Sequence, residues 1–137
     1  MERYRRRLSG PLRDRFDLAL DLPAVSWKEL HEAVGSETSA VVRDRVVAAR
    51  RRQLTRQGRL NARLDGRVLE RVCRITDEES ESILARGSAR FSLSARAICR
   101  ILRVARTIAD LAGQETLSAD HLAEALQFRL QDEASPV

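Results

Sequence analysis

Two arginine-rich segments are the parts of this sequence whose residue types could do chemistry. The first, residues 4–18, reads YRRRLSGPLRDRFDL, and the second, residues 93–111, reads LSARAICRILRVARTIADL. A guanidinium group stays charged at physiological pH, and its planar fork of N–H donors fits the oxygens of a phosphate or a carboxylate. Both segments could therefore bind phosphate, or they could pair with acidic side chains of the same chain.

The sequence lacks the residue sets that would make this chain an independent enzyme. A phosphate-binding loop of the form GxxxxGK followed by Ser or Thr needs its lysine beside a glycine, and the single lysine, Lys28, lies between tryptophan and glutamate. No HExxH, serine-nucleophile or paired-cysteine motif is present. The cysteines and histidines are scattered, at Cys73, Cys99, His31 and His121. We therefore expect no metal site, and both cysteines should be small buried apolar residues.

Both arginine-rich segments resemble signatures of the ComM group of magnesium-chelatase-like AAA+ ATPases. The blocks SAVVRDRV, LNARL and HLAEALQFR are similar to the same group, so the resemblance covers nearly the whole chain. It implies a mainly α, lid-like helical bundle. Residues 1–25 would be the end of an ATPase core, residues 26–131 the helical lid, and residues 132–137 a loose tail.

The resemblance implies a catalytic role for Arg15, the arginine of the DRFD match. In this family that position carries the arginine finger, which reaches into a neighbouring subunit and offsets charge on the phosphoryl group during transfer. The family usually has leucine at the position of Arg13. The alternative, from the residues alone, is that Arg15 pairs with Asp14 or Asp17.

The resemblance gives Arg96, in the LSARA match, the place of the sensor-2 arginine, which contacts the terminal phosphate of the bound nucleotide. Helical spacing places Arg100, Arg103 and Thr107 on the same face as Arg96. The alternative for Arg100 and Arg103 is a solvated helix face.

For the intact protein, the resemblance implies a homo-hexamer that uses ATP and Mg²⁺ for DNA remodelling, such as branch migration. The isolated chain is expected to hold no cofactor and to catalyse nothing. The alternative is a stand-alone basic helical module that binds nucleic acid or a partner protein. Two arginine clusters, Arg5 to Arg7 and Arg50 to Arg52, could follow a nucleic-acid backbone, although no interleaved aromatic residues are available for base stacking.

The composition favours one helical domain. The chain has 137 residues, of which 43% are hydrophobic and only 4% aromatic, so its core must consist of Leu, Ile, Val and Ala. The net charge of +5 divides into +8 on residues 1–74 and −3 on residues 75–137. Arginine in the basic half could recognise phosphate, but 24 arginines against one lysine also indicate a general preference for arginine.

No apolar run is long enough for a membrane span or a signal peptide, so we expect no membrane partner and a cytoplasmic location.

Residues 16–22, FDLALDL, alternate apolar and polar side chains up to Pro23, which predicts a β-strand. No later segment alternates in this way. A lone strand leaves its backbone groups unpaired, so we expect its sheet to lie in an ATPase core outside this chain.

Helices are predicted over residues 26–34, 39–57, 67–74, 76–86, 95–112 and 118–131. Capping boxes at Ser26 and Thr76 should begin two of them, Ser94 should cap another, and Gly87 should end the helix that precedes it. Residues 59–66 should form a loop. The strongest helical pattern runs over 95–112, whose predicted buried residues are Ile98, Ile101, Leu102, Ala105, Ile108, Ala109 and Ala112.

Overall fold

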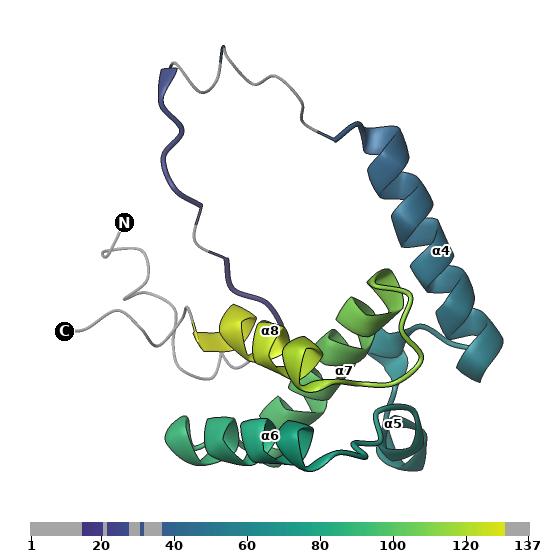
Figure 1. Ribbon diagram of the computed structural model, residues 1–137, viewed down its shortest axis with the longest axis vertical. Helices are drawn as coiled ribbons and strands as arrows, with labels where there is room; N and C mark the ends of the chain where they lie inside the picture. The colour runs from purple at the N-terminus through teal and green to yellow at the C-terminus, as the bar shows by residue number, and fades with distance from the viewer. Residues whose placement is uncertain (1–14, 21, 28–30, 32–36, 131–137) are drawn as a thin grey trace.

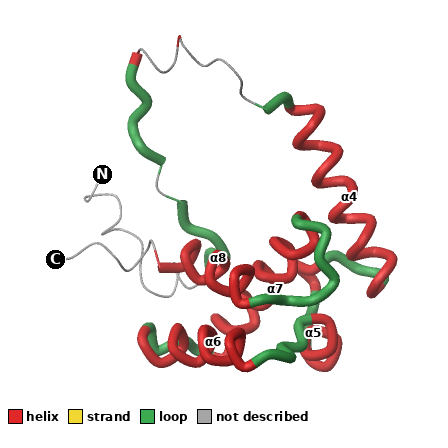
Figure 2. The backbone as a smooth tube through the Cα atoms, in the orientation of Figure 1, coloured by secondary structure: helices red, strands yellow, loops and turns green. Residues whose placement is uncertain are grey.

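A computed structural model describes residues 15–20, 22–27, 31 and 37–130 of the chain. Its helical elements are α4 (Ser39–Gln57), the 3₁₀ helix η1 (Asn61–Arg63), α5 (Gly66–Val72), α6 (Glu78–Arg90), α7 (Ala95–Leu111) and α8 (Ala119–Leu130). Within these ranges no strand is present (Figure 2). The predicted mainly α bundle is therefore confirmed.

Helix α7 lies at the centre of the bundle and packs against α4, η1, α5 and α8, while α6 packs against α8 (Figure 1). The buried apolar cluster contains Leu64, Leu69, Cys73, Ile101, Ala105, Ala109, Leu117, Leu122, Ala125 and Leu126. None of these side chains is aromatic, as the composition predicted. No helix in the described ranges is both long enough and apolar enough to cross a bilayer.

The ends of α4 and α7 follow local signals in the sequence. The side chain of Thr38 accepts a hydrogen bond from the Val41 amide at the start of α4, and Gly58 ends that helix with a φ of 70°. Ser94 accepts from the Ala97 amide at 3.2 Å, which confirms it as the cap of α7. These hydrogen bonds satisfy N–H groups that have no partner inside the helix.

Two predictions around α6 are wrong. Its cap is Asp77, whose carboxylate accepts from the Ser80 amide at 2.8 Å, and not Thr76. The helix also continues through Gly87 to Arg90. A Cβ atom at position 87 would lie 2.9 Å from Cδ1 of Leu126, so the glycine permits close packing of α6 on α8. The predicted loop over 59–66 is likewise interrupted by η1.

The predicted strand over 16–22 is absent from the described part of that segment, residues 16–20 and 22. No second strand exists in the described ranges to pair with it, so its alternation has no sheet to cover. Leu18, Leu20 and Leu22 are consequently more than half exposed. Of the helix predicted over 26–34, residues 28–30 and 32–34 lie outside the described residues, and Trp27 and His31 are helical.

Helix α4 is only partly covered by the bundle. Ala49 and Gln53, in its C-terminal half, are buried, and this half packs against α7. Towards its N-terminus the helix extends away from the other helices (Figure 1), and Val42 and Val46 are exposed. The side of α4 that carries Ala49 thus continues beyond the bundle as an uncovered apolar strip.

We expect Gly87→Val to lower the free energy of unfolding by about 1–3 kcal/mol, because its side chain would press α6 away from Leu126. The exposed residue Ala89 of the same helix supplies a control. Ala89→Val should cost less than about 1 kcal/mol, since only helix propensity changes. Urea denaturation of both variants makes the comparison, and equal stability of Gly87→Val and the unchanged protein would contradict the packing role.

Candidate functional site

Arg96 is the second residue of α7, directly above the Ser94 cap. Its side chain is exposed, and within the described part of the chain it makes no hydrogen bond or ion pair. A guanidinium in the first turn of a helix also lies close to backbone N–H groups that favour anions. Arg96 can therefore offer all of its donors to an external phosphate.

Arg15 is exposed as well, and none of the described residues pairs with it. The sequence allowed a pair with Asp17, but the Asp17 carboxylate instead lies 3.3 Å from Nε of Arg100. Asp14, the other partner considered, lies outside the described residues. The role of Arg15 stays a prediction.

The remaining arginines of α7 are used inside the protein. Arg103 donates from Nε to the Leu64 carbonyl at 2.7 Å, and Arg106 is 1% exposed. The solvated face considered for Arg100 and Arg103 is thus wrong. Of the four arginines of α7, all of which are described, Arg96 is the one left exposed.

Two contacts bring the segment that carries Arg15 to the bundle. The Asp17–Arg100 ion pair ties it to α7, one helical turn beyond Arg96. The Ala19 amide donates to the Phe128 carbonyl, near the end of α8, at 2.8 Å. The structure therefore brings the two predicted segments together through the side chains of Asp17 and Arg100, although it records no contact between Arg15 and Arg96 themselves.

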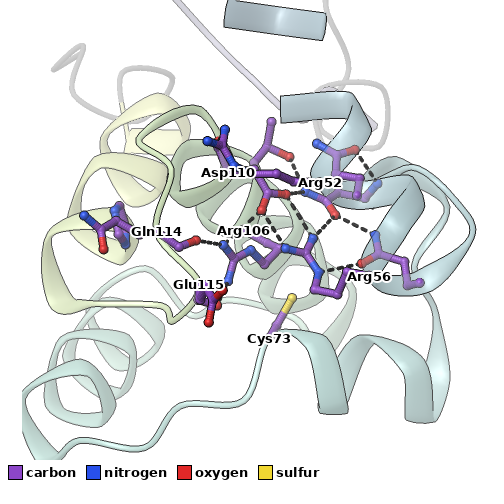
Figure 3. A network of polar contacts seen from close by, with 12 residues as sticks. Arg52, Arg56, Cys73, Arg106, Asp110, Gln114 and Glu115 are labelled. Atoms are coloured by element: carbon purple, nitrogen blue, oxygen red, sulfur yellow. Dashed lines mark hydrogen bonds and ion pairs between the residues drawn. The ribbon is translucent and has the colours of Figure 1, made fainter. Parts of the chain in front are cut away.

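A buried polar network at the other end of α7 was missed by the sequence analysis (Figure 3). At its centre, the fully buried carboxylate of Asp110 accepts hydrogen bonds from Arg56 at 2.6 and 2.9 Å, from Arg106 at 3.0 Å and from Asn61 at 2.8 Å. Arg52 donates to the Asp110 backbone carbonyl at 2.9 Å. The network therefore joins α4, η1 and α7.

Arg106 extends the same network to the connection between α7 and α8. It donates to the backbone carbonyls of Gln114 and Glu115, and both of these contacts appear in Figure 3. A signal for this pair existed in the sequence. Arg106 and Asp110 are four residues apart and directly follow Ala105 and Ala109, two predicted core positions, so they border the buried face.

The network sets the charge of the groups inside it. Burial by itself raises the pKa of Asp110, but hydrogen bonds from Arg56 and Asn61 and the charge of Arg106 outweigh it, so its pKa lies below the ordinary value. Burial lowers the pKa of Arg106, and Asp110 partly offsets this. Burial also raises the pKa of Cys73 to about 11. Asp110 is therefore ionised at neutral pH, and Cys73 is an inert thiol.

The other titratable residues form no ligand set. Cys73 is buried as predicted, whereas Cys99 is only half-buried. His31 Nδ1 lies 3.1 Å from the Trp27 carbonyl oxygen, and His121 Nδ1 accepts from the Ser118 amide at 3.1 Å. Across the described ranges, no three His, Cys, Asp or Glu side chains gather where they could hold a metal ion.

We expect Asp110→Asn to lower the free energy of unfolding at pH 7 by about 3–5 kcal/mol, because the buried guanidinium of Arg106 and the part-exposed guanidinium of Arg56 lose their counter-charge. The stabilisation by Asp110 is present above its unfolded pKa of about 3.9 and is lost as the pH falls through its lower folded pKa. Denaturation midpoints of the unchanged protein should therefore drop in acid below about pH 4, and the part due to Asp110 should be absent from the variant.

Asp65→Asn is the matched control, because that carboxylate is 79% exposed and lies 3.8 Å from Arg59. It should change stability by less than about 1 kcal/mol. An Asp110→Asn variant as stable as this control would show that the network does not hold the helices together.

Comparison with known proteins identifies the family of this chain. A family profile described as "Magnesium chelatase, subunit ChlI C-terminal" matches residues 36–129, a range that includes Arg96 and the whole Asp110 network. Competence protein ComM of Haemophilus influenzae is 43% identical over 128 residues, which cover 93% of this chain and 25% of that protein.

Two further relatives have similar sequence identity and similar coverage of each chain. Uncharacterized protein YifB of Salmonella typhimurium is 44% identical over 131 residues, covering 95% of this chain and 26% of its own length. Uncharacterized protein Rv2897c of Mycobacterium tuberculosis is 39% identical over 133 residues, covering 93% and 26%. The chain thus spans about a quarter of the length of these relatives. It belongs to the magnesium-chelatase-like family of ComM and YifB, and it corresponds to the C-terminal region of magnesium chelatase subunit ChlI.

Proposed function

We propose that this chain is the helical lid of a cytoplasmic AAA+ ATPase of the ComM type, with Arg96 as its sensor-2 residue and Arg15 as its arginine finger. One observation carries the proposal. Arg15 and Arg96 are exposed and make no polar contact within the described ranges, while Arg100, Arg103 and Arg106 are engaged inside the protein. Exposed, unpaired guanidinium groups are what recognition of an external phosphate requires.

Arg96 is suited to sensing because it stands on a rigid element. The far end of α7 is tied to α4 through Asp110, so a force applied at Arg96 acts on the whole helix. In this proposal ATP supplies the phosphoryl group and Mg²⁺ neutralises its charge, both held by a separate ATPase core. Arg96 would approach the terminal phosphate and thereby couple the position of the lid to the state of the nucleotide.

Arg15 would act on the nucleotide of an adjacent subunit in a homo-hexamer. Its guanidinium would offset the charge that develops as the phosphoryl group is transferred. The exposure of Arg15 supports this role, since a buried or paired side chain could not reach the nucleotide of an adjacent subunit. The intact hexamer would use the released energy for DNA remodelling, a step that rests on the resemblance to the ComM group.

The test joins this chain to an ATPase core, in place of the matching segment of a ComM-type ATPase. We expect Arg15→Ala to lower ATP turnover by about 10³-fold or more while nucleotide binding changes little. Arg96→Ala should also reduce turnover strongly, because the lid loses its contact with the phosphate. Steady-state turnover and binding of a fluorescent ATP analogue separate the two effects.

Arg71→Ala supplies the control for both variants, because Arg71 is exposed on α5 and makes no contact that the proposal uses. Its turnover should equal that of the unchanged protein. If Arg15→Ala hydrolyses ATP at the control rate, Arg15 is not the finger. The same result for Arg96→Ala would remove the sensor assignment.

A second candidate function, nucleic-acid binding by a basic helical module, is favoured by the surface of α4. Arg43, Arg50 and Arg51 are exposed there without partners in the described ranges, whereas Arg52 is held by Asp110. The cluster expected at residues 50–52 thus has two free members. Arg5 to Arg7 lie outside the described residues.

This second function predicts salt-dependent binding of duplex DNA by the 137-residue chain. Three phosphate contacts should give a slope of about −3 for the logarithm of the binding constant against the logarithm of the salt concentration. Replacing Arg43, Arg50 and Arg51 by alanine should flatten that slope. Fluorescence anisotropy across a salt series measures it, and a flat response from the unchanged chain would rule out this candidate.

A further inference from the structure

We propose that the Asp17–Arg100 ion pair docks the Arg15 segment on α7, which makes Arg100 a positioning residue for the arginine finger. This inference rests on the proposed function, because it concerns the two residues assigned there to the nucleotide. Neither Asp17 nor Arg100 would touch the nucleotide. Each would act through the residue that lies close to it along the chain.

The ion pair joins an exposed group to a sheltered one. The Asp17 carboxylate lies 3.3 Å from Nε of Arg100, and the exposed fractions of the two side chains are 61% and 14%. Nη1 of Arg100 is buried and has no hydrogen-bond partner. A sheltered guanidinium with an unsatisfied donor favours an acidic neighbour, and Asp17 is the acidic group that approaches it among the described residues.

The segment has few other attachments to the bundle. Leu18 and Leu20 are 52% and 63% exposed, so burial of these side chains does little to hold it. The hydrogen bond from the Ala19 amide to the Phe128 carbonyl provides a second tie, two residues beyond Asp17. The ion pair and this backbone hydrogen bond thus both contribute to docking of the segment, and loss of either should loosen it.

The positions along the chain explain why this docking matters for Arg15. Arg15 precedes Asp17 by two residues, which limits the separation of their Cα atoms to about 7 Å. Arg96 precedes Arg100 by four residues, about 6 Å along the helix axis. Arg15 and Arg96 therefore both leave the backbone close to one ion pair, and a displacement of α7 that follows the nucleotide would move the finger segment with it.

The first experiment measures docking by amide hydrogen exchange in the 137-residue chain. Asp17→Asn and Arg100→Gln should each raise the exchange rate of the Ala19 amide, by up to about fivefold, and the double variant should raise it no further. The amide of Ala105, in the core, should be unaffected by Asp17→Asn. Because Arg100 is sheltered and its variant could unfold, the exposed Asp17 provides the decisive single substitution.

The second experiment measures coupling in the chain joined to an ATPase core. Asp17→Asn and Arg100→Gln should lower kcat by up to about fivefold, because the docked fraction of the segment falls by no more than the factor with which the ion pair stabilises it. KM for ATP should stay within about twofold, and Arg100→Lys should restore most of the turnover. Arg86→Gln, on the exposed side of α6, is the control and should match the unchanged protein.

The outcomes separate this proposal from the function beneath it. Unchanged Ala19 exchange in Asp17→Asn would show that the ion pair does not dock the segment, which overturns the inference. Faster exchange with normal turnover would also overturn it, while the finger and sensor roles would stand. If Arg15→Ala and Arg96→Ala both turn over ATP normally, the proposed function fails, and this inference fails with it.

Discussion

The hydrogen bonding of one buried carboxylate is the constraint on which the rest of this structure depends. Asp110 is fully buried and accepts from Arg56, Arg106 and Asn61, side chains that belong to α4, α7 and η1. Two guanidinium groups share this one negative charge. Removal of the carboxylate would leave both without a counter-charge, and for the buried Arg106 an unpaired charge costs far more than a well-made pair contributes. The network therefore specifies one arrangement of the helices, which a core of Leu, Ile and Ala alone would specify less strictly.

The Asp110 network also explains how α7 can be fixed to its neighbours and still expose Arg96. The C-terminal end of α7 is tied to α4 and, through Arg106, to the connection that leads to α8. In the first turn of α7, next to the Ser94 cap, Ala97 is buried in the bundle while Arg96 is exposed. A helix that is anchored at its C-terminal end and presents Arg96 to solvent at its N-terminal end is suited to transmit a displacement, because its backbone hydrogen bonds keep it stiff over its 17 residues.

Much of the fold could be predicted from the sequence, since local rules govern the elements that were correct. Capping by Ser94 and termination at Gly58 act within a few residues, and helical spacing marked most of the core of α7. The errors arose where the local structure depends on a residue that lies far away along the chain. Glycine often ends a helix, but Gly87 lies inside α6, where the lack of a side chain lets Leu126 pack against it. The alternation over residues 16–22 would form a strand only beside a second strand, which the described residues do not contain. The burial of Asp110 could not be predicted in this way, because hydrophobic periodicity locates buried apolar residues and does not identify a buried charged one.

The abundance of arginine shows why charge alone could not locate the candidate site. Arg56 donates to Asp110, Asn61 and Gln57 at once, which the three donors of a compact lysine ammonium could not do in this planar arrangement. Part of the arginine excess therefore serves the core and carries no information about phosphate binding. Arg15 and Arg96 differ from the interior arginines in lacking partners within the described ranges, and that difference becomes visible only once the chain is folded. Arg43, Arg50 and Arg51 are exposed and unpaired in the same way, so it is the sequence resemblance that singles out Arg15 and Arg96 among the exposed arginines.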